Sequence, residues 1–416
     1  MNIYFSGIGG IGISALAQFC LNRGDNISGS DIAESVMTRF LAKKGVLINF
    51  KQTAENISTN IDLLVYTEAV PVNNPERKRA QELKIPQKSY FEYLGEISRN
   101  FRTIAVAGTH GKTTTTGLIS AGFLATKVNP TVVVGTVLNL FNGSNFHAGD
   151  NEFLIVEACE YRENFRFLNP EIIILTGIDH DHIDAFPTEE SYFLAFEKFI
   201  KKAKTVVYHA DDENIAKVLQ NFAGQKIAVQ NSAKKLDLKL IGEFNQRNAL
   251  LAVKLAEVLK LDLKSFTKGL QKFAGAGRRQ EFLGEKDGVL FYDDYAHHPV
   301  EIRELYKSFK EKFRGKKVGM VFEPHQHSRT KELFRGFCQV FAKIDKLGIM
   351  PIYAARDSAE DKKFTIDNFF RENSEWQKIK DYSDMRKFLQ GFGKGDVVIF
   401  CGAGNISDFG RNFLKL

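Results

Sequence analysis

Residues 103–114 read TIAVAGTHGKTT, and this stretch predicts a strand, a turn and a helix in the middle of the chain. A β-branched apolar run is followed by a glycine turn, which leads into the start of a helix. In such a turn, backbone N–H groups and the helix dipole face an anion, Lys112 reaches terminal phosphates and Thr113 can ligate magnesium. Val106 stands where the longer GxxxxGK[ST] loop has its first glycine, and the alternative is a chance glycine turn. The pattern predicts an ATP site with Mg²⁺ built from Gly108, Thr109, His110, Gly111, Lys112, Thr113 and Thr114.

A second glycine turn lies near the start of the chain, where Gly7, Gly9, Gly10 and Gly12 follow the run NIYF. Glycines at this spacing let the backbone approach a diphosphate closely. Asp31 follows at roughly the distance at which an acidic residue often meets a ribose hydroxyl. By itself the pattern would indicate a dinucleotide-dependent oxidoreductase, but here it shares the chain with an ATP-type loop.

Apolar runs alternate with amphipathic stretches along the chain, which is typical of βαβ units and parallel sheet. At 416 residues the chain is too long for one hydrophobic core. A fresh strand begins at Thr103 after the polar stretch SRNFR, and glycines interrupt a helical pattern from Ala274 onward. We therefore expect an α/β protein with three domains, at residues 1–100, 101–273 and 274–416.

Composition argues against several classes of protein. Hydrophobic residues make up 44% and charged residues 26% of the chain, which are ordinary globular values. We see no run of about 18 apolar residues and no basic leader, so we expect a cytosolic protein without membrane insertion. The four cysteines lack CxxC spacing, which argues against a zinc knuckle or a disulfide framework. The formal charge of +7 is spread along the chain, which favours phosphate-bearing small molecules over nucleic acid.

Acidic and histidine side chains follow two apolar runs of the buried-strand kind. Glu157 closes FLIVE, and Asp181 and His182 follow IIILTGI. Sites in open α/β sheets form at the carboxyl ends of strands, and hard carboxylate oxygens suit magnesium. We expect Glu157 to hold one ion with Thr113 and another with His182. The alternative is a solvated charged loop that ends at Asp184.

Polar clusters near the second boundary provide further candidates. Asn245 and Asn248 lie at the entrance to a helix, where an amide can read a base or simply cap the helix. The segments GRRQEF and DDYAHHP, at residues 277–282 and 293–299, bring arginines, aspartates and histidines close in sequence. Arginine suits bidentate phosphate binding. His325 and Arg329 follow the strand VGMVF, and a surface salt bridge is the alternative for the arginine.

In this order the motifs resemble the Mur ligase family. The matching segments are GIGGIG, GTHGKTTT, EACEY, IDHDHID, FNQRNALLA, GAGRRQEF, DDYAHHP, PHQHSRT, IYAAR and CGAGNI, which together cover nearly the whole chain. The resemblance implies a Rossmann-like N-terminal domain for a UDP-sugar, a central P-loop ATPase domain with mainly parallel sheet, and a Rossmann-like C-terminal domain that closes over ATP and the amino acid. It also implies an ATP-dependent ligase, a monomer or homodimer, that joins L-alanine to the lactyl carboxylate of UDP-N-acetylmuramate through an acyl phosphate in peptidoglycan precursor synthesis.

The resemblance assigns roles to individual residues. Lys112, Glu157, His182 and Arg279 would be catalytic, and Thr113, Glu157 and His182 would hold magnesium. The UDP-sugar would meet Gly7, Gly9, Gly10, Gly12 and Asp31. The ATP side would be completed by Asn245, Asn248, Arg279, Asp293 and His297. The incoming amino acid would meet His325 and Arg329.

The chain departs from the family pattern at a few positions. Phe244 stands where many relatives have His, Gln326 stands where some have Arg, and GAGNI replaces a GAGDI-like ending. Residues 206–240 look short for the family, which points to a reduced accessory sheet. A recycling ligase that attaches a whole tripeptide would share nearly every motif and remains the alternative. A folylpolyglutamate-synthetase-like ligase would not need GIGGIG, an NAD-dependent dehydrogenase would leave GKTTT unexplained, and a silent binding partner would not need Lys112.

Overall fold

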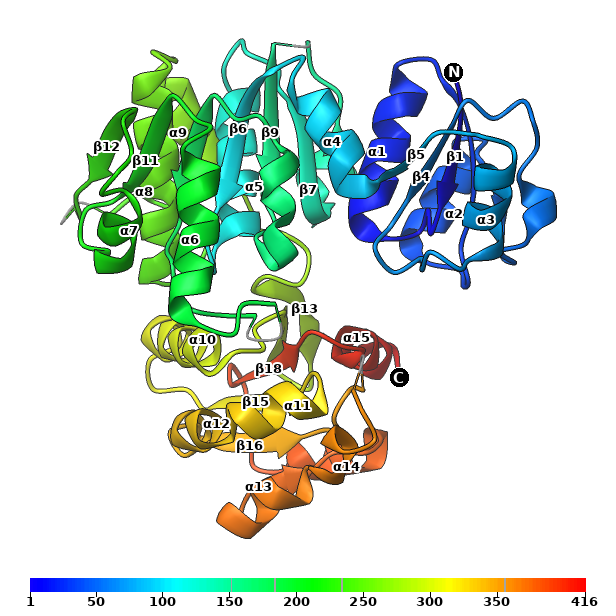
Figure 1. The fold of residues 1–416 in the computed structure, drawn as a ribbon. Helices are drawn as coiled ribbons and strands as arrows, with labels where there is room; N and C mark the ends of the chain where they lie inside the picture. Colours follow the sequence, from blue (N-terminus) through cyan, green and yellow to red (C-terminus); the bar gives the residue numbers. More distant parts are fainter. Residues whose placement is uncertain (151, 183–184, 233–234, 355–356) are drawn as a thin grey trace. The chain divides into compact units, whose positions relative to one another are not determined.

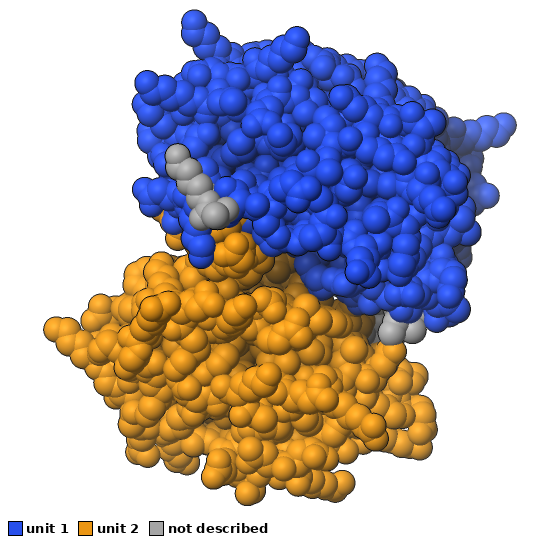
Figure 2. Space-filling view, turned by 90° about the vertical axis from the view of Figure 1, so that its left-hand side faces the viewer, with its two compact units in different colours: residues 1–238, 247–273 blue, residues 239–246, 274–416 orange. Residues whose placement is uncertain are grey.

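The structure, a computed structural model, describes residues 1–150, 152–182, 185–232, 235–354 and 357–416. The described residues divide into two compact units, one of residues 1–238 and 247–273 and the other of residues 239–246 and 274–416, traced in Figure 1 and coloured separately in Figure 2. They form three β-sheets joined by helices, as expected for an α/β protein. Asp184 and the last two residues of the IYAAR segment lie outside the described residues. Among the described residues, no helix is both long and apolar enough to cross a membrane.

The first sheet is parallel and belongs to the N-terminal part of the chain. Its strand order is β3-β2-β1-β4-β5, so the chain switches direction across the sheet beside β1, where open α/β sheets bind ligands. The strands are β1 (Asn2–Ser6), β2 (Asn26–Ser30), β3 (Leu47–Asn49), β4 (Leu63–Tyr66) and β5 (Gln87–Ser89). The helices are α1 (Ile11–Asn22), α2 (Val36–Lys43), α3 (Pro75–Glu82) and α4 (Tyr90–Ser98), with a 3₁₀ turn at Ala54–Asn56.

The central sheet has the strand order β12-β11-β10-β6-β9-β7-β8, and the β7–β8 pair is antiparallel. Its strands are β6 (Arg102–Ala107), β7 (Thr131–Leu138), β8 (Ser144–His147), β9 (Phe153–Glu157), β10 (Ile172–Leu175), β11 (Thr205–His209) and β12 (Gln225–Val229). The helices are α5 (Lys112–Leu124), α6 (Glu189–Ile200), α7 (Glu213–Val218), α8 (Glu243–Val258) and α9 (Leu263–Lys272), with 3₁₀ segments at Asn139–Phe141 and Tyr161–Phe167. The neighbouring parallel strands β10, β6 and β9 bring their carboxyl ends to one edge of the sheet.

Two glycines fix helix α5 against its surroundings. A Cβ at Gly117 would lie 2.4 Å from the ring of Phe273, and one at Gly122 would lie 2.4 Å from the ring of Phe266 on α9. Both rings therefore pack directly on the helix backbone, and almost all of α5 is buried. The helix that follows the GTHGKTT loop is thus held by close packing at two points along its length.

The third sheet lies in the second unit, with the strand order β13-β14-β18-β15-β16-β17 and an antiparallel β13–β14 pair. Its strands are β13 (Glu281–Lys286), β14 (Val289–Asp294), β15 (Val318–Glu323), β16 (Lys346–Ile349), β17 (Gln377–Lys378) and β18 (Val397–Gly402). The helices are α10 (Pro299–Lys312), α11 (His327–Glu332), α12 (Phe334–Phe341), α13 (Asp367–Glu372), α14 (Tyr382–Phe388) and α15 (Ile406–Lys415), with a 3₁₀ turn at Asp361–Lys363. Buried aromatic and aliphatic side chains fill both faces of this sheet.

The expected domain boundaries fall between elements of secondary structure. Residue 100 lies between α4 and β6, and residue 274 follows α9 where the second unit resumes. Helix α8 begins in the second unit and continues in the first from Arg247 onward. The division into three domains at these residues stays a prediction.

Candidate active site

The loop predicted to bind ATP connects β6 to α5 at the carboxyl edge of the central sheet. Gly108 and Gly111 have left-handed backbone angles, with φ of +134° and +81°. A Cβ at Gly108 would lie 2.3 Å from the hydroxyl oxygen of Thr176, and one at Gly111 would lie 2.9 Å from Oδ1 of Asn248. Glycine fits both positions without strain. Because Gly111 is the N-cap and has no side chain to accept a hydrogen bond, it leaves the first N–H groups of α5 available to an anion.

Lys112 folds back onto this loop. Its Nζ donates to the carbonyl oxygens of Gly108 at 2.6 Å and Thr109 at 3.0 Å, and to Oε1 of Glu160 at 2.9 Å. Burial acts to lower the pKa of Lys112, but the Glu160 carboxylate outweighs it, so the pKa lies above its usual value. Lys112 is therefore a protonated cation at neutral pH.

Glu160 is not among the residues predicted from the sequence, although it belongs to the segment EACEY. Its side chain is only 3% exposed, and the same Oε1 atom lies 3.4 Å from Nε2 of His182. Burial acts to raise the pKa of Glu160, but Lys112 and His182 outweigh it and lower that pKa. The available signal was a charged residue three positions beyond Glu157 in an otherwise apolar stretch, FLIVEACEY.

Thr113 and Glu157 lie together, as predicted for a magnesium site. The Thr113 hydroxyl donates to Oε1 of Glu157 at 2.7 Å, and the Gly135 N–H donates to Oε2 at 2.9 Å. These hydroxyl and carboxylate oxygens are hard donors, so the residues present fit Mg²⁺. Among the described residues, no group of three or more His, Cys, Asp or Glu side chains could hold a metal ion. An ion here would therefore depend on Thr113 and on phosphate oxygens as well as on Glu157.

Thr109 ties the loop to the segment that follows β10. Its N–H donates to the carbonyl of Gly177 at 2.8 Å, and its hydroxyl donates to the carbonyl of Asp179 at 2.8 Å. The hydroxyl also lies 2.9 Å from the Tyr192 hydroxyl on α6. The carbonyl of His110 accepts a hydrogen bond from Thr176. These contacts hold Gly108–Thr114 beside the segment that carries His182.

Side chains of the protein pack directly against the glycine turn of the first sheet. The Gly9 N–H donates to Oδ2 of Asp31 at 2.7 Å. A Cβ at Gly9 would lie 2.7 Å from Cγ2 of Thr38, and one at Gly12 would lie 2.9 Å from the Tyr90 ring. The structure thus brings together the residues predicted for the UDP-sugar: Gly7, Gly9, Gly10, Gly12 and Asp31.

A buried carboxylate lies at the same edge of the first sheet. Glu76 is 0% exposed, and it accepts hydrogen bonds from the Tyr4 hydroxyl, the Ser6 and Ser30 hydroxyls and the Asn56 amide, at 2.5 to 2.8 Å. Ser6 and Ser30 are the last residues of β1 and β2. The sequence carries no local signal of this network, because α3, which reads PERKRAQE, has the composition of a solvated helix.

In the third sheet, two consecutive carboxylates at the end of β14 have different partners. Asp293, the predicted residue, accepts from the Ser407 hydroxyl at 2.5 Å and lies 3.6 Å from Nε of Arg278. Asp294, which was not predicted, accepts from two backbone N–H groups, including that of Gln280 at 2.8 Å. Burial raises the pKa of Asp293, and raises the pKa of Asp294 to about 6. Asp294 therefore anchors the backbone beside Arg279.

The predicted basic residues of the second unit also come together. The Arg279 guanidinium lies 5.2 Å from the centre of the Tyr295 ring, and the His297 and His325 rings lie 6.4 Å apart. Burial lowers the pKa of His297 to about 4, and the charges of Arg329 and Arg279 contribute. His297 is therefore neutral at pH 7. Arg279, His297, His325 and Arg329 form one cluster in this unit.

The two asparagines predicted to face adenine belong to different units. Asn245, in the second unit, donates from Nδ2 to the carbonyl of Ile241 at 2.8 Å and lies 3.3 Å from Oε1 of Gln280. Asn248, in the first unit, lies against Gly111 of the phosphate loop. Both are buried. The Asn245 side chain therefore bonds to a carbonyl that precedes the helix.

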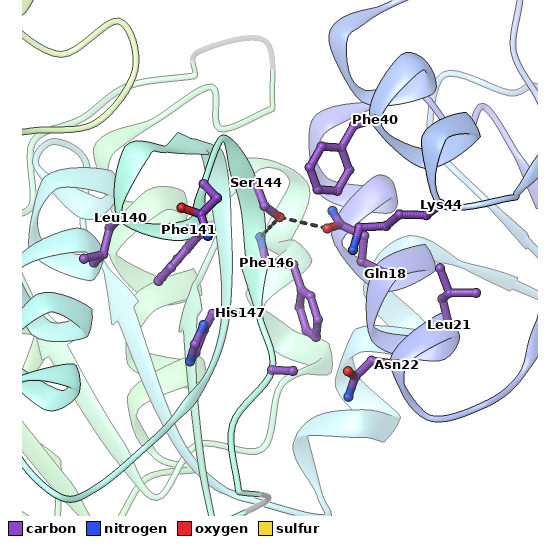
Figure 3. Close-up of a pocket in the computed structure, with 12 residues that line it drawn as sticks. Gln18, Leu21, Asn22, Phe40, Lys44, Leu140, Phe141, Ser144, Phe146 and His147 are labelled. Carbon is purple, nitrogen blue, oxygen red and sulfur yellow. Dashed lines mark hydrogen bonds between the residues drawn. The ribbon is translucent and has the colours of Figure 1, made fainter.

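A cavity of about 420 Å³ lies elsewhere in the first unit, between α1 and α2 on one side and the β7–β8 hairpin on the other (Figure 3). Two of the residues that line it are joined by a hydrogen bond, in which the Ser144 hydroxyl donates to Oε1 of Gln18 at 2.8 Å. Phe40, Lys44 and His147 are among its walls. None of the predicted site residues lines this cavity.

Comparison with known families gives the class of the protein. Three family models match in order: "Mur ligase family, catalytic domain" over residues 2–102, "Mur ligase middle domain" over residues 106–235, and "Mur ligase, glutamate ligase domain" over residues 278–404. The three matches correspond in order to the first, central and third sheets, and the second match begins within β6. The fold and the phosphate loop define an ATP-dependent ligase. The chain belongs to the Mur ligase family.

Individual relatives and solved structures show which members of the family this chain is similar to. The chain is 36% identical to the UDP-N-acetylmuramate--L-alanine ligase of Clostridium kluyveri, over 99% of this chain and 98% of the relative. It is also 36% identical to the ligase of the same name from Agathobacter rectalis, over 100% and 98%. The crystal structure of a UDP-N-acetylmuramate-alanine ligase from Thermotoga maritima matches with a TM-score of 0.84 and 27% identity, over 100% of this chain and 98% of that one. A murein peptide ligase from Psychrobacter arcticus shares the fold, with a TM-score of 0.72 and 21% identity over 100% and 98%.

Proposed function

We propose that this protein is an ATP-dependent ligase that joins L-alanine to the lactyl carboxylate of UDP-N-acetylmuramate, with an acyl phosphate as intermediate. One observation carries the proposal, namely that the chain matches ligases of that name from end to end at 36% identity. The geometry supports it, because the loop that carries Lys112 meets the Thr113–Glu157 pair at the carboxyl ends of the parallel strands β6 and β9.

The reaction needs activation of a carboxylate. An amine does not displace oxide from a carboxylate, so the γ-phosphate of ATP is first transferred to the lactyl carboxylate and ADP leaves. The amine of L-alanine then attacks the acyl carbon, and phosphate is the leaving group. The first step demands mainly positioning and neutralisation of charge on the transferring phosphoryl group.

The residues of the central sheet fit the phosphoryl transfer. Lys112 orients the γ-phosphate while the N–H groups at the start of α5 bind phosphate oxygens. Thr113 and Glu157 would hold Mg²⁺, with His182 at a second position, and the ion would supply positive charge beside the phosphates. Thr109 and Tyr192 keep the loop in place through the hydrogen bonds described above.

The remaining predicted residues divide between the substrates. Gly7, Gly9, Gly10, Gly12 and Asp31 bind the UDP-sugar. Asn245, Asn248, Arg279, Asp293 and His297 complete the ATP site, and His325 with Arg329 receives L-alanine. His297 is neutral at pH 7, so the positive charge of its cluster comes from Arg279 and Arg329. This charge suits an anionic substrate.

The rival function is attachment of a whole tripeptide in peptidoglycan recycling. The solved murein peptide ligase from Psychrobacter arcticus shares the fold, so the fold does not distinguish the two functions. The end-to-end likeness to alanine-adding ligases at 36% identity favours L-alanine.

The test is phosphate release from ATP with UDP-N-acetylmuramate, with L-alanine or L-Ala-γ-D-Glu-meso-diaminopimelate added in parallel. Mass spectrometry identifies the product. We expect release with L-alanine and a product whose mass corresponds to one added alanine. Release with the tripeptide alone would move the protein to recycling, and release with neither would overturn the proposed substrates.

A further inference from the structure

Glu160 makes contacts that none of the proposed residue roles explains. Its carboxylate is buried, with Oε1 shared between Lys112 at 2.9 Å and His182 at 3.4 Å. The other oxygen, Oε2, has no hydrogen-bond partner among the described residues. A buried carboxylate with one oxygen unsatisfied is costly, and it persists where the surrounding structure or function requires it.

All three hydrogens of the Lys112 ammonium group have partners in this arrangement. Two are donated to carbonyl oxygens of the loop, at Gly108 and Thr109, and one to Glu160. An ammonium group has three donors, so Lys112 contacts a phosphate oxygen only when it gives up one of these bonds. Glu160 also cancels the positive charge that would attract the phosphate.

The backbone holds Glu160 firmly in this position. The Glu163 N–H donates to the carbonyl of Glu160 at 2.8 Å, and Arg162 and Glu163 both have positive φ, of 52° and 56°. His182, the other neighbour of the carboxylate, also has a positive φ of 57°. Non-glycine residues keep such angles where tertiary contacts impose them. Glu160 is therefore the fixed partner, and the long side chain of Lys112 is the part that can move.

We propose that Glu160 is a positioning residue that restrains Lys112 against its own loop and thereby weakens nucleotide binding, so that ADP is released after turnover. When a nucleotide binds, Lys112 exchanges its contact with Glu160 for a phosphate oxygen. When ADP leaves, the ion pair forms again. The proposal rests on the function proposed above, because it takes the 108–114 loop as the ATP site.

The experiment compares ADP binding to wild type and to Glu160→Gln by titration calorimetry in EDTA, which removes magnesium from the comparison. Gln keeps the size of the side chain and removes its charge. Loss of one charged hydrogen bond that competes with the phosphate corresponds to a gain of about tenfold in ADP affinity. In steady state with magnesium, we expect the KM for ATP to fall and kcat not to rise, because ADP leaves more slowly.

The matched control is Glu163→Gln, the same substitution three residues along. Glu163 is 29% exposed and its partner is Lys198 at 3.5 Å, so this variant removes one negative charge from the same segment without touching Lys112. We expect its ADP affinity to equal that of wild type. Equal gains in both variants would assign the effect to general charge and overturn the proposal.

Other outcomes also decide the matter. Unchanged or weaker ADP binding by folded Glu160→Gln would overturn the proposal, and weaker binding only with magnesium present would make Glu160 a metal ligand instead. If Glu160→Gln fails to fold, Glu160→Asp decides, because it keeps the charge but draws it back from Lys112. About two- to threefold tighter binding is then expected, and no gain contradicts the proposal. Wild type that binds no ADP would overturn the proposed function itself.

Discussion

The two glycine turns of this protein have the same place in the fold and different contents. Each follows the first strand of its sheet and leads into a helix, at Gly7–Gly12 around the start of α1 and at Gly108–Gly111 before α5. The first turn is occupied by a carboxylate of the protein, because the Gly9 N–H donates to Asp31. The second is occupied by a cation of the protein, because Lys112 bonds to two carbonyls of the loop.

The two turns show how much a glycine pattern specifies. In the first turn a Cβ would collide with Thr38 or Tyr90, so the glycines serve close packing as well as backbone approach to a ligand. In the second turn, positive φ angles at both glycines bend the loop around Lys112. Glycine spacing therefore predicts a close backbone approach, while the charged residue beside it determines the chemistry.

The largest expected effect comes from Lys112→Ala in the second turn. Removing the cation that we propose orients the γ-phosphate should lower kcat by about a thousandfold or more. Phosphate release measures the rate, and circular dichroism checks that the variant is folded. Lys127→Ala, at an exposed lysine beyond α5, is the matched control and should keep the wild-type rate. A folded Lys112→Ala enzyme with a near-normal rate would remove the distinction between the two turns.

A smaller loss is expected from Glu157→Gln, which removes the charge that we propose holds Mg²⁺ beside the second turn. The amide still accepts from Thr113 but carries no charge for Mg²⁺, so we expect about a hundredfold lower rate and a higher magnesium requirement. Initial rates over a range of Mg²⁺ concentrations give both quantities. Glu152→Gln, an exposed change on the approach to β9, is the control. An unaltered magnesium dependence in Glu157→Gln would separate this carboxylate from the metal.

Asp31→Asn probes the first turn alone. The neutral side chain retains an acceptor for the Gly9 N–H but loses the charge, so we expect the KM for UDP-N-acetylmuramate to rise about tenfold through weaker charged hydrogen bonds. The KM for ATP should stay unchanged, because Asp31 belongs to the first sheet. Steady-state kinetics with each substrate varied in turn distinguish these effects. A change confined to the KM for ATP would reverse the assignment of the two turns.

The smallest effect is expected outside both turns, at His209. This residue is 1% exposed and neither ring nitrogen has a hydrogen-bond partner among the described residues. Burial lowers the pKa of His209 from 6.5 to about 4, so the unfolded chain binds a proton more readily. The contribution of the neutral histidine to the free energy of unfolding is fully present above pH 6.5 and is lost as the pH falls towards 4. At pH 5 the loss amounts to about 2 kcal/mol.

His209→Phe should therefore lose less stability than wild type between pH 7 and pH 5. Thermal unfolding at a series of pH values measures the difference, and each protein at pH 7.5 serves as its own reference. Turnover at pH 7.5 should not change. Parallel pH profiles of the two proteins would show that His209 is not neutral in the folded protein.

The sequence predicted the parts of the site whose signals are local. The strand, glycine turn and helix around Lys112 form as expected, and Glu157 lies beside Thr113 because β6 and β9 are neighbours with Val106 opposite Glu157. Both signals need only the rule that parallel strands end at one edge. The roles assigned to individual residues stay predictions until the variants above are measured.

Other parts could not be predicted from local patterns. Glu160 and Glu76 look like ordinary charged residues in the sequence, and their burial depends on which elements pack against them. Asp293 and Asp294 are adjacent on one strand, and alternation places them on opposite faces without saying which face carries Arg279. The segment of Asn245 and Asn248 was read as one helix entrance, whereas the boundary between the two units divides it.

The proposed reaction requires that the lactyl carboxylate is activated as an acyl phosphate. Labelling that carboxylate of UDP-N-acetylmuramate with ¹⁸O and measuring the mass of the phosphate released during turnover with L-alanine tests it directly. If the acyl phosphate forms, each phosphate carries one oxygen from the carboxylate, because the amine breaks the bond between the acyl carbon and that oxygen. Phosphate without the label would contradict it.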